Sequence, residues 1–205
     1  MLAVVAGLVV WRNEWGIEDG KRVWSLVESW LLERPWWIVL ALVILPGFPF
    51  PVSVLLLLAG SVWSDRPWMA GAVCLGAIAL NLSWTYWFAA AWGRKLIEDL
   101  LGDMAVRIPD VGKFGHRRLI LLLRLTPGMP LFLQNYALGF LRIPFRLYLP
   151  LSMLCVAPVS LGFLLGGAGL AKGNLMPLLS GVSLVVLALV IAKMVGEKLK
   201  PRARD

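Results

Sequence analysis

The chain has 205 residues, of which 60% are hydrophobic and only 16% are charged. Soluble domains have about 45–50% apolar and about 25% charged residues, so this composition excludes an ordinary soluble enzyme and indicates one helical membrane domain. A net charge of +8 would suggest nucleic acid in a soluble protein; beside apolar segments it indicates membrane orientation instead, and we expect no nucleic-acid partner.

Residues 1–34 form the predicted N-terminal region. Residues 1–11 are apolar but would reach only about 16 Å as a helix, so we expect a short anchor, tilted or partly inserted. They lack a basic flank and a clear cleavage site, which argues against a cleaved signal peptide. Residues 18–34 mix charges with apolar residues at helical spacing, which predicts an amphipathic helix lying in the interface.

Residues 36–63 form an uncharged segment that is broken in the middle. The run Pro-Gly-Phe-Pro-Phe-Pro at 46–51 removes backbone donors and cannot continue a helix. The arms on either side, Trp36–Leu45 and Val52–Trp63, are each about half the length needed to cross a bilayer. This pattern predicts a re-entrant hairpin, because broken helices at membrane depth must be packed in protein or line a polar cavity.

Residues 119–140 repeat this arrangement. The arms Leu119–Thr126 and Leu131–Phe140 would rise only about 12 Å and 15 Å, against about 30 Å of hydrocarbon. They flank Pro-Gly-Met-Pro at 127–130, which shares the Pro-Gly-x-Pro pattern of the first break. We therefore predict a second re-entrant hairpin.

Each hairpin is followed by an uncharged run that is long enough to span, at 68–92 and 147–170. A third span is predicted at 175–192, before a basic tail at 196–205. The predicted fold is an all-α integral membrane protein whose membrane domain, 35–195, contains two repeats of hairpin plus transmembrane helix. No metal site, disulfide or cofactor is expected, because the two cysteines lack metal-ligand spacing.

The distribution of Lys and Arg orients these repeats. With both hairpins re-entrant, one side carries 13 basic residues and the other 6; if both segments span, the split is 11 against 8. The positive-inside rule favours the re-entrant arrangement with a cytoplasmic C-terminus. The two repeats are then inverted, and the hairpin tips meet near the midplane, as in transporters with broken helices.

Residues of the second hairpin resemble the central motif of the DedA/VTT-domain superfamily, also called SNARE-associated Golgi proteins: Arg124, Pro127, Pro130, Asn135, Tyr136 and Gly139. The run Arg142–Tyr148 continues the motif, and residues 45–47 with Gly60 match the first hairpin, so that the resemblance covers residues 17–195. It implies a lipid-handling protein of a bacterial plasma membrane, since bacterial members are implicated in recycling undecaprenyl phosphate and eukaryotic relatives scramble phospholipids.

One departure from the family pattern concerns acidic residues. Many bacterial DedA proteins carry carboxylates in and beside the first hairpin, which are thought to couple transport to protons. Here all twelve Asp and Glu lie outside the apolar segments. This argues against proton coupling by that route and places the sequence nearer the TVP38-like branch.

Arg124 is the leading candidate for substrate binding, because it is the only charge inside an apolar run. Such a residue usually faces a partner, a cavity or a substrate, and its planar fork suits phosphate. The alternatives are that it caps carbonyl groups freed at the hairpin tip or pairs with a carboxylate from elsewhere.

Further substrate-binding candidates are the polar residues of the two repeats: Gln134, Asn135, Tyr136, Asn81, Arg142 and Arg146. The amides have an alternative role in hydrogen bonds across helices, and the two arginines an alternative role as interfacial anchors. The prolines and glycines of the hairpins are expected to be structural: Pro46, Gly47, Pro49, Pro51, Gly60, Pro127, Gly128, Pro130 and Gly139.

The sequence thus favours a membrane transporter that flips or scrambles an anionic lipid, such as a polyprenyl phosphate or a phospholipid. The alternatives are a small-solute transporter of the same fold and a membrane assembly or homeostasis factor without transport. We expect no enzyme, because no apolar segment contains a His, Asp or Glu to act as acid, base or metal ligand. The expected partners are membrane lipids, and a homo-oligomer is compatible with the sequence.

Overall fold

The computed structural model describes residues 17–93, 115–126 and 129–199, and every regular element in these ranges is a helix. The predicted anchor at 1–11 lies outside them. The elements are α2 (Ile17–Glu33), α3 (Trp36–Ile44), the 3₁₀ turn η1 (Leu45–Gly47), α4 (Val52–Val62), α5 (Pro67–Phe88), the π-helical turn η2 (Ala89–Gly93), α7 (His116–Leu125), α8 (Leu131–Phe140), α9 (Phe145–Lys172) and α10 (Leu175–Leu199).

Three helical stretches are long and apolar enough to cross a bilayer: Pro67–Gly93, Phe145–Lys172 and Leu175–Val195. They coincide with the three spans predicted from the sequence. Two prolines lie inside α9, at 150 and 158, without ending the helix. Apolar helices of a membrane domain tolerate proline because neighbouring helices and local adjustments satisfy the freed backbone groups.

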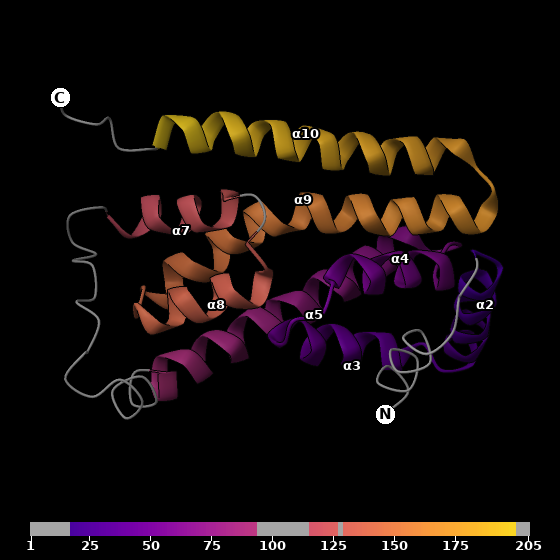
Figure 1. Ribbon diagram of the computed structural model, residues 1–205, viewed down its shortest axis with the longest axis horizontal. Coiled ribbons are helices and arrows are strands. Elements are labelled where there is room, and N and C mark those ends of the chain that lie inside the picture. The colour runs from indigo at the N-terminus through magenta and orange to yellow at the C-terminus, as the bar shows by residue number, and fades with distance from the viewer. Residues whose placement is uncertain (1–16, 94–114, 127–128, 200–205) are drawn as a thin grey trace.

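The first proline segment folds into two short helices that turn back on themselves. α3 has 9 residues and α4 has 11, and the 3₁₀ turn between them contains Pro46. Pro46 provides no N–H, and Pro51 holds an extended backbone conformation immediately before α4 begins. In Figure 1 both arms lie in the same half of the molecule, so that the chain returns to the end where α2 lies.

The second proline segment forms the matching pair at the other end of the molecule. α7 and α8 have 10 residues each, and α7 ends at Leu125, which is followed by Thr126 in an extended backbone conformation. Figure 1 shows both arms beside the end of α9 at which that helix begins. The two broken segments therefore occupy opposite halves of the bundle.

The two pairs pack crosswise on the long helices. α3 contacts α5 and α4 contacts α9, whereas α7 contacts α9 and α8 contacts α5. Each return arm approaches its long helix at a glycine: a Cβ on Gly60 would collide with the Leu164 carbonyl oxygen of α9, and one on Gly139 with the Tyr86 carbonyl oxygen of α5. These glycines allow backbones to touch, as small residues do between membrane helices.

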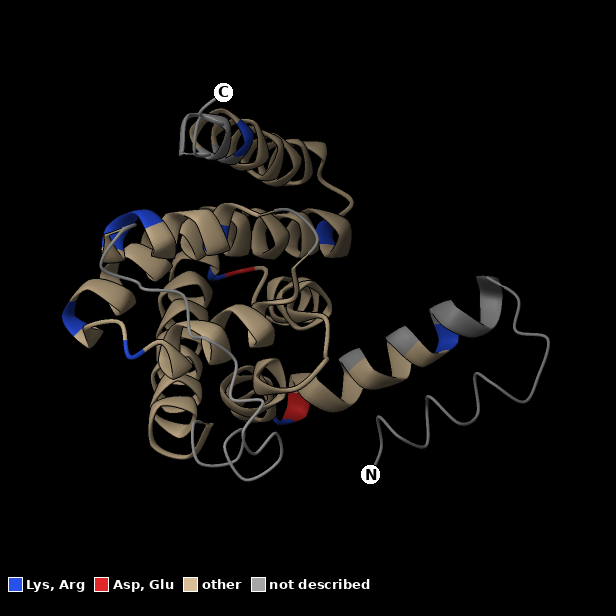
Figure 2. Ribbon diagram, turned by 60° about the vertical axis from the view of Figure 1, so that its left-hand side comes forward, with Lys and Arg blue, Asp and Glu red and all other residues tan. Residues whose placement is uncertain are grey.

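The first and last described helices lie at the periphery. α10 packs along α9, where a Cβ on Gly181 would meet the backbone of Gly162 and Gly166, and its other faces are apolar and exposed. α2 is a helix over the segment where the sequence predicts an amphipathic one, and it meets α3 at a bend of 110°. Figure 2 shows it extending away from the bundle. Its location in the membrane interface remains a prediction.

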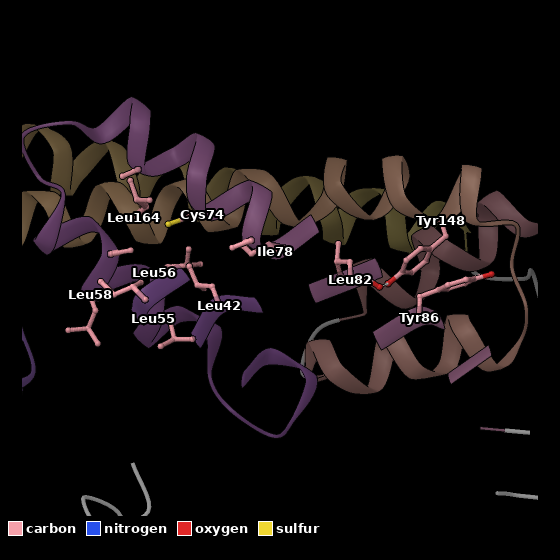
Figure 3. Packing of buried hydrophobic residues seen from close by; sticks show 14 of the residues in the cluster. Leu42, Leu55, Leu56, Leu58, Cys74, Ile78, Leu82, Tyr86, Tyr148 and Leu164 are labelled. Atoms are coloured by element: carbon pink, nitrogen blue, oxygen red, sulfur yellow. Dashed lines mark hydrogen bonds between the residues drawn. The ribbon is translucent and has the colours of Figure 1, made fainter. Parts of the chain in front are cut away.

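The buried core runs along α5. At one end of Figure 3, Leu42, Leu56 and Ile78 join the first hairpin to α5; at the other, Tyr86 and Tyr148 join α5 to α9. The second group differs from the first because its side chains carry hydroxyl groups, which require hydrogen-bond partners once buried.

Candidate functional site

Arg124 occupies the last turn of α7, where the apolar run of that helix carries it into the protein. Its side chain is only 9% exposed, and it is the only buried Lys or Arg among the residues whose burial the structure describes. Charged side chains are rarely buried unless they are paired. The atoms around the guanidinium therefore determine what this residue can do.

Three neutral side chains hold the guanidinium. Nε donates to Ser152 Oγ at 3.0 Å, Nη1 to Gln134 Oε1 at 3.2 Å and Nη2 to the Tyr148 hydroxyl at 3.3 Å. The central carbon also lies 5.5 Å from the centre of the Tyr148 ring, which is cation–π geometry. Gln134 comes from α8, and Ser152 and Tyr148 come from α9, so the three elements that meet here fix the orientation of the fork.

The positive charge of Arg124 has no carboxylate to balance it within the described part of the chain, where no Asp or Glu is buried. An arginine has five N–H donors, and three of them have partners here. Taking an ion out of water costs several kcal/mol even after the protein relaxes. Within the described ranges, two donors of this buried guanidinium have no acceptor, so it is suited to receive an anion.

Tyr148 connects this arginine to α5. Its hydroxyl lies 3.0 Å from the carbonyl oxygen of Leu82 and 3.4 Å from Asn135 Oδ1, but a hydroxyl has a single proton to donate. The shorter distance assigns that proton to Leu82. Asn135 Nδ2 is buried and has no partner among the described residues, and turning this amide would let Nδ2 donate to the tyrosine oxygen.

The Tyr148 ring is itself held by packing. Tyr86 of α5 stacks on it with ring centroids 4.7 Å apart, and Phe145 lies 5.3 Å from Tyr86. The Tyr86 hydroxyl donates to the Ile143 carbonyl oxygen. Figure 3 shows the two tyrosines side by side next to Leu82. The Tyr148 hydroxyl, which accepts a hydrogen bond from Arg124, is thus held in position by α5 and α9.

The tip of the first hairpin is held differently. The last carbonyl groups of a helix have no intrahelical partner, and here the Val43 carbonyl oxygen accepts hydrogen bonds from Asn81 Nδ2 at 2.8 Å and Trp84 Nε1 at 2.6 Å. The Tyr136 hydroxyl donates to the Gly47 carbonyl oxygen at 2.7 Å, which ties α8 to the first break. Both contacts satisfy backbone groups that the prolines have freed.

The structure therefore separates the residues that the sequence grouped as substrate-binding candidates. It brings Gln134 and Asn135 to Arg124, directly or through Tyr148. Asn81 and Tyr136 hold the first hairpin instead. Among the described residues, the hydrogen bonds of Arg124 run to neutral side chains. Residues 127 and 128 of the hairpin tip lie outside the described ranges, so a role of Arg124 in capping carbonyl groups there stays a prediction.

Arg142 and Arg146 are exposed on the surface and are not among the hydrogen-bond partners that the structure describes around Arg124. Arg142 has a left-handed backbone, with φ 49°, at the end of α8. Its N–H donates to Gly139 and that of Ile143 to Leu138, which together form a Schellman cap in the place where glycine is usual. This arrangement favours a role as exposed anchors at the helix end over direct binding beside Arg124.

Sequence reasoning missed two residues of the cluster, Tyr148 and Ser152. Tyr148 was included only as a motif residue, and Ser152 was not considered. The available signal was their spacing: polar residues at i and i+4 of an apolar span share one face of the helix. Among the described residues, no group of three His, Cys, Asp or Glu is placed to hold a metal ion.

Comparison with known proteins gives one match. No curated protein and no solved structure matches the chain significantly. The family model described as the VTT domain matches residues 50–169, which is more than half of the chain and includes Arg124 and its three hydrogen-bond partners. The chain therefore belongs to the VTT domain family of the DedA/VTT superfamily and is an integral membrane protein of that type.

Proposed function

We propose that this protein moves an anionic lipid, such as a polyprenyl phosphate or a phospholipid, across the bilayer, and that Arg124 meets the headgroup. The observation that carries this proposal is the buried guanidinium, whose hydrogen-bond acceptors in the described part of the chain are all neutral. A phosphate oxygen reaching the two spare N–H donors would form short, charge-assisted hydrogen bonds and neutralise the site. The tails would remain in the surrounding bilayer.

The proposed topology has both hairpins re-entrant, entering from opposite sides, as inverted repeats. The Asp65–Lys172 ion pair, at 2.8 Å, supports this for the second hairpin. The chain between Asp65 and Lys172 contains α5, the second hairpin and α9. Since α5 and α9 each cross the membrane once in this topology, the two residues lie on the same side only if the second hairpin does not cross. The arms pack crosswise on α5 and α9, and each return arm approaches its long helix at a glycine. Both features support the inverted relation between the two repeats.

The surroundings of Arg124 give a mechanism for headgroup binding. Ser152, Gln134 and Tyr148 fix the guanidinium plane before the ligand arrives, so little side-chain entropy is lost on binding. The first hairpin, tied to α8 by Tyr136, would form the other wall of the passage. We place the C-terminus in the cytoplasm and the protein in a bacterial plasma membrane, because the basic residues of the chain favour that orientation and the family includes such members.

Reconstitution into liposomes tests the proposal. Labelled phospholipid or polyprenyl phosphate is placed in both leaflets, and the fraction that reaches an added quencher or reductant is followed in time. Wild type should transport at least one of them, Arg124→Ala should not, and Arg124→Lys should retain an intermediate rate because it keeps the charge and loses the fork. Arg66→Ala, which removes an exposed arginine, is the matched control.

Circular dichroism and thermal unfolding of the same preparations separate binding from folding. Normal transport by a folded Arg124→Ala protein would exclude the substrate role. Transport of soluble anions but not of lipids would favour the small-solute alternative, and transport of neither would favour an assembly factor.

The topology has its own test. Arg34→Cys and Arg66→Cys, each in a background in which Cys74 and Cys155 are replaced by alanine, should react with an impermeant maleimide from the same side of the membrane. Reaction from opposite sides would show that the first proline segment crosses. A third cysteine at Lys172 should share the side of Arg66→Cys, because of the ion pair with Asp65.

A further inference from the structure

We propose that the Arg124 site selects headgroups by charge number and accepts a phosphate group that carries one negative charge in preference to one that carries two. This rests on the proposed function, since it concerns the ligand of the same site. The chemistry that would be recognised is a phosphodiester, or a phosphomonoester in its singly protonated form.

The first step of the argument is the number of cations. Arg124 is the one Lys or Arg that is buried among the residues whose burial is described, and Arg142 and Arg146 are exposed at the end of the bundle. The hydrogen-bond partners of the guanidinium in the described part of the chain are neutral: Gln134 from α8, and Tyr148 and Ser152 from α9. The Cys155 thiol of α9 also lies within electrostatic reach of Arg124. One negative charge therefore makes the site neutral, and a second has no cation of its own.

The second step concerns the cost of a second charge. The attraction between a ligand and one guanidinium grows in proportion to the ligand charge, whereas the cost of desolvating the ligand grows with the square of that charge. A dianion thus gains twice the attraction of a monoanion for about four times the desolvation cost. In a site enclosed by Gln134, Tyr148 and Ser152, all buried, the desolvation cost decides the preference.

The third step concerns the donors. Three of the five N–H groups of Arg124 have acceptors among the described residues, and the other two are available to the ligand. Two donors match the two unesterified oxygens of a phosphodiester. In a dianionic phosphomonoester a third oxygen, which has no proton, would be buried without a donor from Arg124, and this adds a further cost. In the singly protonated form that oxygen is a hydroxyl group, which can itself donate a hydrogen bond.

Two short-chain lipids with identical tails test the proposal on the purified full-length protein. Dihexanoyl phosphatidylglycerol is a phosphodiester with one charge at pH 5.5 and at pH 8.5, whereas dihexanoyl phosphatidic acid gains its second charge between these values, because the second pKa of a phosphate monoester is about 6. Dissociation constants are measured by calorimetry below the critical micelle concentration of the ligands.

We expect the dissociation constant of phosphatidic acid to rise by about tenfold or more from pH 5.5 to pH 8.5, and that of phosphatidylglycerol to change by less than about twofold. The second lipid controls for any effect of the pH change on the protein itself. Equal or tighter binding of phosphatidic acid at pH 8.5 would overturn the charge preference.

Variants distinguish this failure from failure of the proposed function. Arg124→Ala should lose both lipids at both pH values, and Arg124→Lys, which keeps one charge, should bind more weakly while preserving the contrast between the lipids. Arg66→Ala should behave like wild type. If wild type binds neither lipid, both the anionic-lipid function and the charge preference are wrong. Dimethyl phosphate, which has the same charge and no tails, should bind far more weakly than phosphatidylglycerol; equal binding would identify a free phosphodiester as the ligand.

Discussion

The two hairpins share the Pro-Gly-x-Pro break but use their buried polar groups in different ways. At the first tip, Asn81 and Trp84 donate to a backbone carbonyl oxygen of α3, and the result is neutral. At the second, Arg124 brings a positive charge to Gln134 and the α9 hydroxyl groups. The comparison shows that the same kind of break occurs in a neutral setting and in a charged one, and that the difference between them is the buried Arg124.

The largest expected effect comes from the glycines that both hairpins share. Gly60→Ala and Gly139→Ala should each lower the free energy of unfolding by about 1–3 kcal/mol or more, because the added Cβ meets backbone atoms of α9 or α5. Thermal unfolding in detergent measures this. Gly76→Ala is the control, since nothing lies within 4 Å of its Cβ position. An effect at only one of the two positions would contradict the parallel between the hairpins.

Trp84→Phe changes the first, neutral hairpin tip, and its effect on transport can be compared with that of Arg124→Ala at the second, charged tip. Removing the indole N–H leaves Asn81 as a donor to the Val43 carbonyl oxygen and should lower the free energy of unfolding by about 0.5–1.5 kcal/mol. Transport measured per folded protein should remain near that of wild type. A Trp84→Phe protein that folds normally and loses lipid transport would show that the first tip also serves the substrate.

Tyr148→Phe sharpens the description of the charged tip. The change keeps the ring beneath Arg124 and removes the hydroxyl that joins the guanidinium to α5, so we expect a several-fold loss of transport and a loss of about 1–3 kcal/mol in stability. Tyr86→Phe also removes a hydroxyl bonded to a backbone carbonyl and does not touch Arg124. Equal transport by the two variants would mean that Tyr148 has only a structural role.

Asp65→Asn removes the ion pair with Lys172 and should have only a small effect on thermal stability. The hydrogen bond from Lys172, followed by the attraction of its charge, lowers the pKa of Asp65 below the ordinary value of 3.8. A lowered pKa means that the ion pair stabilises the fold above pH 3.8 and is lost as the pH falls through the lower, folded-state value. Thermal unfolding should therefore differ little between Asp65→Asn and wild type, and the difference should disappear in acid.

Collapse of the proton gradient should leave transport unchanged. The first hairpin carries no carboxylate, and no Asp or Glu is buried in the part of the chain that the structure describes. The measurement is lipid exchange in proteoliposomes with and without a protonophore. Complete loss of exchange by an intact protein would reveal a coupling site outside the hairpins.

The sequence by itself determined the class of fold, the three spans and the two breaks. Uncharged runs long enough to cross a bilayer leave few alternatives, and proline cannot donate the hydrogen bond that a continuous helix needs. The sequence also identified Arg124 as the leading candidate for substrate binding, because a charged side chain in an apolar run is costly and usually faces a partner, a cavity or a substrate. These conclusions depend on the chemistry of residues that are close together in the sequence, so they can be drawn without the tertiary structure.

Only the tertiary structure decided which polar residues surround that arginine. Asn81 and Asn135 are the same residue type in similar apolar settings, yet one supports a backbone carbonyl and the other reaches Tyr148. Ser152 and Tyr148 became part of the site because α9 passes both α7 and α8. Contacts of this kind depend on how the helices cross. The crossing is set by the close backbone approaches at Gly60 and Gly139. The spacing of residues along a single helix does not reveal these approaches.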